Sequence, residues 1–163
     1  MKNTLIIFSI LIFSSVLTSI NFVACSNLGS DETKLPMEIV MDGTFSAIDD
    51  KREVLINNNE QFQSLMNEIY KNLDQIPRTP VVDFTKNSVI AVFIGTRSNG
   101  GFMVAIDSIT EGSNSISVNI TENTPGINCV VTEAITKPFS IVKIPKTDKK
   151  PVFKTKQIVK DCQ

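Results

Sequence analysis

The chain has 163 residues, 42% hydrophobic and 20% charged, with 16 Lys and Arg against 17 Asp and Glu. This length fits one ordinary globular domain, and a formal charge of −1 without a basic run excludes a protein that binds duplex nucleic acid. The sequence contains no histidine, so it lacks the commonest general base, the commonest metal ligand and every Ser-His-Asp triad. We therefore expect a binding or structural protein that has no catalytic residues, cofactor, metal or small-molecule substrate.

The first residues are typical of an export signal. Lys2 supplies a positive charge, and a run of sixteen mostly apolar residues follows from Leu5 to Ile20. These features are the first two regions of a secretory signal. We interpret residues 1–24 as a lipoprotein signal peptide because of the short motif with which the segment ends.

That motif, from Phe22 to Cys25, resembles the bacterial lipobox, with Phe22 where leucine is usual. In such a signal the cysteine, here Cys25, carries the acyl chains. Several chains hold a protein in a membrane because each buried methylene contributes about 0.8 kcal/mol. Ser26 after the cysteine favours, by analogy, the outer membrane of a bacterial cell envelope. The alternative is an uncleaved anchor or a plain signal peptide cut nearby.

Two parts are expected after the signal peptide. Residues 25–36 are predicted to be a flexible tether, because Ser26 to Pro36 include just two apolar side chains. Residues 37–163 contain no internal repeat, low-complexity tract or domain boundary. We expect them to form a single globular domain.

The pattern of the domain is mostly of period two, which predicts strands. Two are expected at Glu38–Ile48 and Glu53–Ile56, joined by a charged turn. Both alternating sets of Ser88–Gly95 are apolar, so this strand is expected to be buried on both faces and central. Four further strands are predicted at Phe102–Asp107, Ser115–Ile120, Ser140–Ile144 and Val152–Val159.

One helix is expected between the second and third strands. Asn57 to Asn59 offer side-chain oxygens to the free amides of a helix start. Apolar residues then recur at steps of three and four, at Phe62, Leu65, Met66, Ile69 and Leu73. The helix is expected to end by Gln75, because Pro77 and Pro80 cannot donate backbone hydrogen bonds.

These elements predict an α+β fold that is mainly antiparallel β. We expect about six or seven strands in a sandwich or open barrel, with one amphipathic helix packed on the sheet. The last strand carries Lys154, Lys156 and Lys160, and lysines along an exposed edge discourage pairing with other chains.

Three cysteines are present, and free thiols seldom persist in exported proteins. If Cys25 is acylated, Cys129 and Cys162 remain as a pair, for which we expect a disulfide. A nucleophile at Cys129 is the functional alternative, but no histidine is available to generate its thiolate. A free or intermolecular cysteine is the third possibility.

Two glycine-containing loops are the candidate partner-binding sites. Rigid exposed loops that display an Arg, a Phe or an Ile are typical of binding surfaces. The simpler interpretation is that both are connecting turns that need glycine for backbone reasons. The candidate residues are Arg97, Ser98, Asn99, Gly100, Gly101 and Phe102 in the first loop and Thr124, Pro125, Gly126 and Ile127 in the second.

The order of several short motifs resembles the PrcB-like family over residues 43–160. The family takes its name from a small accessory lipoprotein of a bacterial surface protease complex. No single motif is diagnostic, and their shared order carries the resemblance. The motifs are Pro80–Phe84, Val89–Gly95, Gly100–Phe102, Thr124–Gly126 with Cys129, and Pro138–Lys146.

The resemblance implies a non-catalytic role. A PrcB-like protein is expected to bind, and to stabilise, a secreted or surface protease or another envelope protein. The alternative is a loop-type peptidase inhibitor, because an exposed Gly-Gly-aromatic hairpin also resembles the wedges of such inhibitors. An enzyme is the third and least supported reading.

Overall fold

The computed structural model describes residues 32–73 and 77–162. The signal peptide, the acylation site at Cys25 and most of the predicted tether lie outside these residues. Within the described part of the chain, no helix is long and apolar enough to cross a membrane.

The described residues form eight strands and one helix. The elements are β1 (Thr33–Leu35), β2 (Glu38–Gly43), β3 (Lys51–Ile56), α1 (Asn59–Ile69), β4 (Asn87–Ile94), β5 (Met103–Glu111), β6 (Ser115–Pro125), β7 (Phe139–Pro145) and β8 (Lys150–Lys160).

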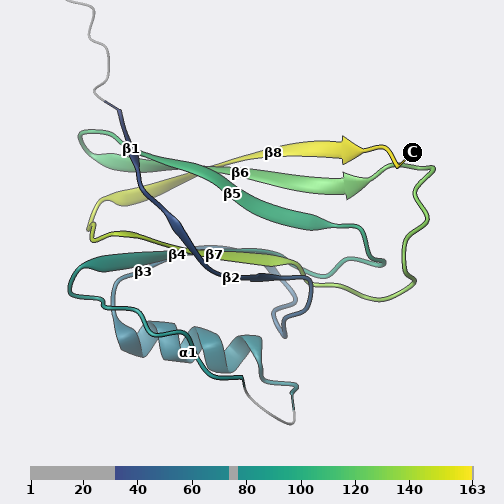
Figure 1. Cartoon of the computed structure of the whole chain (residues 1–163), viewed down its shortest axis with the longest axis horizontal. Helices are drawn as coiled ribbons and strands as arrows, with labels where there is room; N and C mark the ends of the chain where they lie inside the picture. Colours follow the sequence, from purple (N-terminus) through teal and green to yellow (C-terminus); the bar gives the residue numbers. More distant parts are fainter. Residues whose placement is uncertain (1–31, 74–76, 163) are drawn as a thin grey trace, which may run out of the picture.

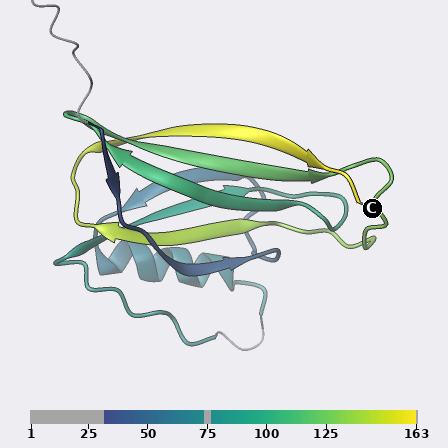
Figure 2. The same cartoon turned by 45° about the horizontal axis from the view of Figure 1, so that its top comes forward.

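The strands make two sheets that pack face to face, and α1 covers the outer face of one of them (Figures 1 and 2). The first sheet has the order β1-β5-β6-β8, and the second has the order β2-β7-β4-β3. The expected α+β class, a mainly antiparallel sandwich with one helix on a sheet, is confirmed. The pairing of β6 with β8 is parallel, from Ser115 opposite Lys150 to Pro125 opposite Lys160.

Strand β1, which was not predicted, lies in the segment expected to be a tether. Thr33–Leu35 pair with β5 in an antiparallel ladder, with Thr33 opposite Glu111. Three residues are too few to show an alternating pattern, so the sequence could not reveal this strand. Its extended conformation comes from pairing with the backbone of β5. The structured domain therefore begins before Met37.

Strand β4 is the centre of the molecule, as its sequence predicts. Val89, Ala91 and Phe93 belong to the core under α1. The alternating residues Ile90, Val92 and Ile94 belong to the core between the two sheets.

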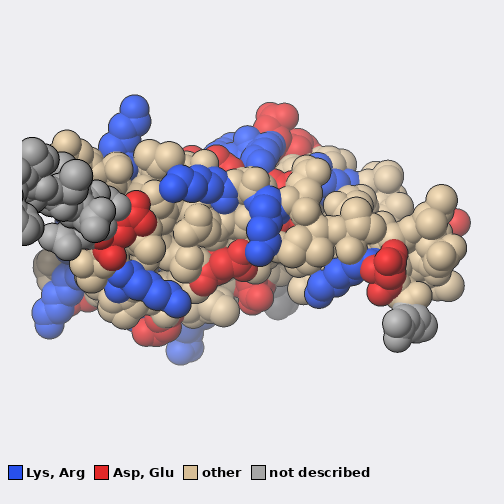
Figure 3. Space-filling model, turned by 90° about the horizontal axis from the view of Figure 1, so that it is seen from above, with Lys and Arg blue, Asp and Glu red and all other residues tan. Residues whose placement is uncertain are grey.

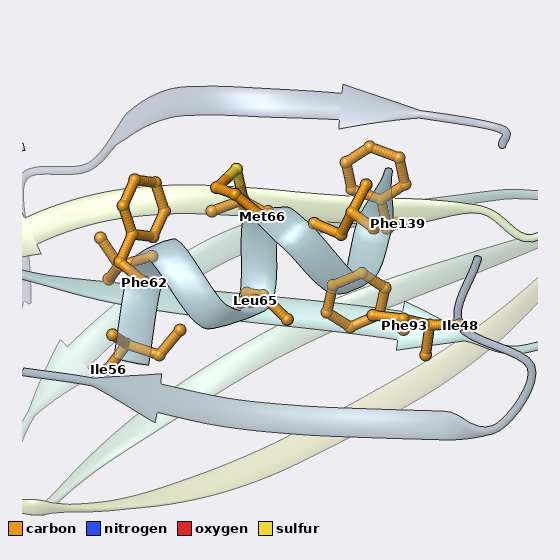
Figure 4. Packing of buried hydrophobic residues seen from close by; sticks show 11 residues of the cluster. Ile48, Ile56, Phe62, Leu65, Met66, Phe93 and Phe139 are labelled. Atoms are coloured by element: carbon orange, nitrogen blue, oxygen red, sulfur yellow. The ribbon is translucent and has the colours of Figure 1, made fainter. Parts of the chain in front are cut away.

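The core under α1 joins the helix to the second sheet (Figure 4). Phe93 of β4 stacks on Phe139 of β7, with ring centroids 5.7 Å apart. The buried face of α1 consists of Phe62, Leu65, Met66 and Ile69.

The helix begins where the asparagines predict but ends earlier than expected. The Asn58 side chain accepts a hydrogen bond from the Gln61 amide at 2.9 Å, as an N-cap does. The last helical residue is Ile69, whose carbonyl accepts a hydrogen bond from the Ala47 amide at 2.9 Å. That carbonyl would bond the Leu73 amide in a longer helix, so Leu73 turns away and is 53% exposed.

Candidate protein-binding end of the sandwich

The two candidate loops lie at the same end of the sandwich. The connection from β4 to β5 contains Arg97–Phe102, and the connection from β6 to β7 runs through residues 126–138. Backbone hydrogen bonds join the two in both directions between Arg97 and Thr136, at 2.8 and 3.0 Å. The Gly100 amide also donates to the Thr132 carbonyl at 2.8 Å. The first candidate loop is therefore covered along one side by the connection from β6 to β7.

This close packing explains why glycine stands at position 101 of the first candidate loop. Gly101 has φ +88°, a conformation that residues with a side chain rarely adopt. A Cβ at Gly101 would also lie 2.9 Å from Val131 and 3.0 Å from Pro125. Glycine is needed here by the backbone and by the approach of the second connection, which supports the simpler interpretation of this loop.

Arg97 and Phe102 were candidate anchors, with a core position as the alternative for Phe102 because it alternates with Val104 and Ile106. The structure packs both side chains against neighbouring groups, and Phe102 takes the core position. The Phe102 ring is half-buried and packs against the core between the sheets. The guanidinium of Arg97 lies over that ring, 5.7 Å from its centroid. It also lies 3.9 Å from a carboxylate oxygen of Glu122. Both side chains therefore stabilise the loop rather than project from it.

Glu122 is a buried acidic residue that the sequence analysis did not identify. It is 4% exposed, on the inner face of β6, and its carboxylate accepts a hydrogen bond from Lys51 Nζ at 2.7 Å. That hydrogen bond raises the pKa of Lys51 above its usual value. A buried carboxylate needs such partners, because its charge is poorly solvated inside a protein. The alternation Ile116, Val118, Ile120 leads to Glu122 and was the available signal, but the strand was expected to end at Ile120.

The other candidates of the first loop differ in exposure. Ser98 is exposed, whereas Asn99 is half-buried and its carbonyl accepts a hydrogen bond from the Thr136 hydroxyl at 2.9 Å. The Asn99 side-chain oxygen is buried without a hydrogen-bond partner among the residues of the structure.

The second candidate loop is partly strand. Thr124 and Pro125 are the last residues of β6, and Gly126 donates its amide to the Lys160 carbonyl at 2.8 Å. Ile127, the next residue, is 98% exposed. Of this loop, Ile127 alone protrudes from the end of the sheet.

Further exposed apolar side chains lie at this end of the sandwich. Val130 is 101% and Ile135 65% exposed, both on the same connection. Phe45, 67% exposed, follows Thr44, whose carbonyl accepts a hydrogen bond from the Lys137 amide. We call Phe45, Ile127, Val130 and Ile135 the loop-end patch. This end of the molecule shows mostly uncharged surface (Figure 3).

A disulfide between Cys129 and Cys162 crosses this end, with the Cα atoms 4.9 Å apart. It links the connection that carries the patch to the end of β8. Closing a chain segment of this length stabilises a fold by about 3 to 4 kcal/mol through the entropy of the unfolded chain. Within residues 32–73 and 77–162, no group of three or more Cys, Asp or Glu residues is placed to hold a metal ion.

The fold and this end define a class of protein: a disulfide-linked β sandwich, covered by one helix, that displays apolar side chains on its loops. Residues 88–145, from β4 to β7, match the family model described as PrcB C-terminal. This match confirms the resemblance to the PrcB-like family over residues 88–145, within the 43–160 for which it was expected, and suggests an accessory role in a protease complex. No curated protein and no solved structure matches the chain.

The packing of Arg97 predicts a structural effect of its removal. Arg97→Ala should lower the free energy of unfolding by about 1 kcal/mol, because the contacts with Glu122 and the Phe102 ring are lost. Chemical denaturation measures this change. Ser98→Ala is the control at the neighbouring exposed position and should leave the midpoint unchanged. Equal midpoints for Arg97→Ala and the wild type would contradict the assigned role.

The disulfide predicts a redox-dependent stability. Replacing both Cys129 and Cys162 by serine should lower the free energy of unfolding by about 3 kcal/mol. A reductant should destabilise the wild type to a similar extent and should not affect the double variant. Mass spectrometry of a non-reduced digest should show the two peptides linked. Complete alkylation of both thiols without reductant would show that the bond is absent from the protein.

Proposed function

We propose that this protein is a non-catalytic lipoprotein of a bacterial cell envelope that binds and stabilises a secreted or surface protease, or another envelope protein. The observation that carries the proposal is the loop-end patch on a connection held by a disulfide. The family match supports the accessory role, because it includes both candidate loops.

The patch has the physical properties of a binding surface. Ile127 and Val130 are almost completely solvated, and burying one such side chain contributes roughly 1.5 to 3 kcal/mol. Several exposed apolar side chains at one end of a domain are typical of protein interaction sites. Burial of the patch against a partner would therefore supply a substantial part of a binding free energy.

The patch is also ordered before it meets a partner. The disulfide, the hydrogen bonds between Arg97 and Thr136, and that from Gly126 to Lys160 hold its connection at several points. A loop that is already fixed loses less entropy on binding, which strengthens association.

The direction of the chain supports presentation away from a membrane. The first described strand enters the sheet with Thr33 opposite Glu111, at the end of β5 remote from Met103 and the patch. The eleven residues of β6 extend between these ends, roughly 35 Å at the rise of a strand. A lipid anchor at Cys25 would hold the near end at the membrane and leave the patch accessible.

The inhibitor alternative receives less support from the geometry. An inhibitory wedge needs an exposed Gly-Gly-aromatic turn, whereas Gly100 is buried against the second connection and Phe102 packs on the core. An accessory subunit leaves its protease active, so the activity of a captured protease separates the two functions.

The patch predicts which substitutions abolish partner capture. Ile127→Asp with Val130→Asp should reduce co-purification of the partner by roughly tenfold or more, since a buried charge opposes binding. Thermal stability should change little, because both side chains are exposed. Val81→Asp, at another position that is 95% exposed, is the matched control and should bind like the wild type.

The partner is identified by cross-linking in cells followed by mass spectrometry, and its peptidase activity is measured with and without the protein. Undiminished capture by the double variant would contradict the patch as the binding surface. Loss of peptidase activity on binding would favour the inhibitor.

Lipidation predicts a second cellular result. A palmitate analogue should label the wild-type protein, and Cys25→Ala should remove both the label and the attachment to membranes. The domain itself should remain folded in the variant. Equal labelling of the variant and the wild type would overturn the lipobox interpretation.

A further inference from the structure

The last strand, β8, has a long unpaired edge. It is the terminal strand of the first sheet, and its eleven residues pair on one side with β6. At the opposite edge of the same sheet, β1 has three residues. A long exposed edge carries backbone groups that another strand can bond.

The hydrogen bonds define which residues of β8 face this edge. The Lys160 carbonyl accepts a bond from Gly126, so Lys160 is directed at β6. In a strand the amide and the carbonyl of one residue point to the same side, and successive residues alternate. The residues that direct their backbone groups away from β6 are therefore Pro151, Phe153, Thr155, Gln157 and Val159. Pro151 has no amide proton to leave unpaired, which suits an edge position.

The side chains of β8 separate by charge. Phe153 packs into the core between the sheets, so the residues that alternate with it lie on the outer face. Four of these are exposed lysines: Lys150, Lys154, Lys156 and Lys160. Basic side chains lie across the middle of this face, with acidic ones among them (Figure 3).

These lysines differ from others in the molecule. Lys51, Lys137, Lys143 and Lys149 each form an ion pair, whereas none of the four on β8 does so within the part of the chain that the structure describes. Lys154 and Lys156 line a shallow depression with Asp107, whose carboxylate accepts a hydrogen bond from Thr121. We call Lys150, Lys154, Lys156 and Lys160 the lysine stripe. Acidic groups lie near it, Asp107 beside Lys154 and Lys156 and Glu53 within hydrogen-bond distance of the Thr155 hydroxyl, but none forms an ion pair with its lysines among the described residues.

We propose that the free edge of β8 binds an extended acidic segment of a partner polypeptide, which adds to the first sheet as a further strand. The backbone groups of Phe153, Thr155, Gln157 and Val159 would bond the segment. Its acidic side chains on the outer face would lie beside the lysines, and opposite charges on neighbouring strands attract. A second copy of β8 is disfavoured there because lysine would face lysine. The site is separate from the loop-end patch and does not depend on the proposed function.

The test uses a fluorescent synthetic peptide that is as long as β8 and alternates glutamate with valine. Fluorescence anisotropy measures its binding to the protein, with the residues that precede β1 retained. Binding is expected and should weaken as salt is added. Lys154→Glu with Lys156→Glu should reduce the affinity by roughly tenfold or more. Lys34→Glu with Lys71→Glu, at exposed positions with the same change of charge, is the control and should retain most of the affinity.

A pair of N-methylated peptides tests for a new strand directly. Methylation of the amides at all glutamates, or at all valines, blocks one side of an extended peptide at a time. One of the two peptides should fail to bind and the other should bind, because a strand offers only one side to β8. Equal binding of both would show simple charge attraction and overturn the proposal.

Two further results separate this site from other surfaces. Ile127→Asp with Val130→Asp should leave peptide binding unchanged, so failure here is distinct from failure of the proposed function. Vesicles containing phosphatidylglycerol provide the remaining comparison. If vesicles bind through Lys154 and Lys156 while the peptide does not bind, the lysine stripe is a membrane-binding surface. That result would overturn the proposal.

Discussion

The burial of β4 on both faces is the constraint on which the rest of the fold depends. A strand without a solvated side must be covered by two layers, here α1 on one side and the first sheet on the other. Covering β4 brings β6 and β5 over it from one side and the buried face of α1 from the other. The ends of these elements then determine where the connecting loops emerge, and thus where the loop-end patch lies.

At the loop end, polar and covalent links replace hydrophobic layers as the source of order. Glu122 reaches inward from β6 and lies between Lys51 at the start of β3 and Arg97 in the connection from β4. These three residues join the two sheets where the apolar core ends. The disulfide restrains the outer part of the same region. A rigid base of this kind explains how Ile127 and Val130 remain solvated on an ordered loop.

The first sheet distributes its surface unevenly. At one end β1 enters from the N-terminal segment, along one edge β8 exposes lysines, and at the other end lie the apolar side chains of the patch. The family match runs from β4 to β7 and includes neither α1 nor β8. The match therefore covers the central strands and their loops, while the lysines of β8 lie outside it.

The sequence by itself determined the elements whose signal is local. The two apolar sets of β4 follow from composition, the start of α1 from the Asn58 side chain, and the exposed edge from the lysines of β8. The pairing of Cys129 with Cys162 followed from the count of cysteines together with the expectation that the chain is exported and that Cys25 is acylated. In each case one segment, or one count, contains all the information that the inference needs.

Only the tertiary structure decided which segments meet. Thr33–Leu35 became a strand because β5 lay beside them, α1 ended at Ile69 because Ala47 took its carbonyl, and β8 paired in parallel with β6. Arg97 and Phe102 turned inward because Glu122 and the core lay beneath them. Periodicity reports how one segment divides its own faces between water and the interior. It does not report which distant group satisfies a hydrogen bond or a buried charge, because those partners are brought together only by the packed chain.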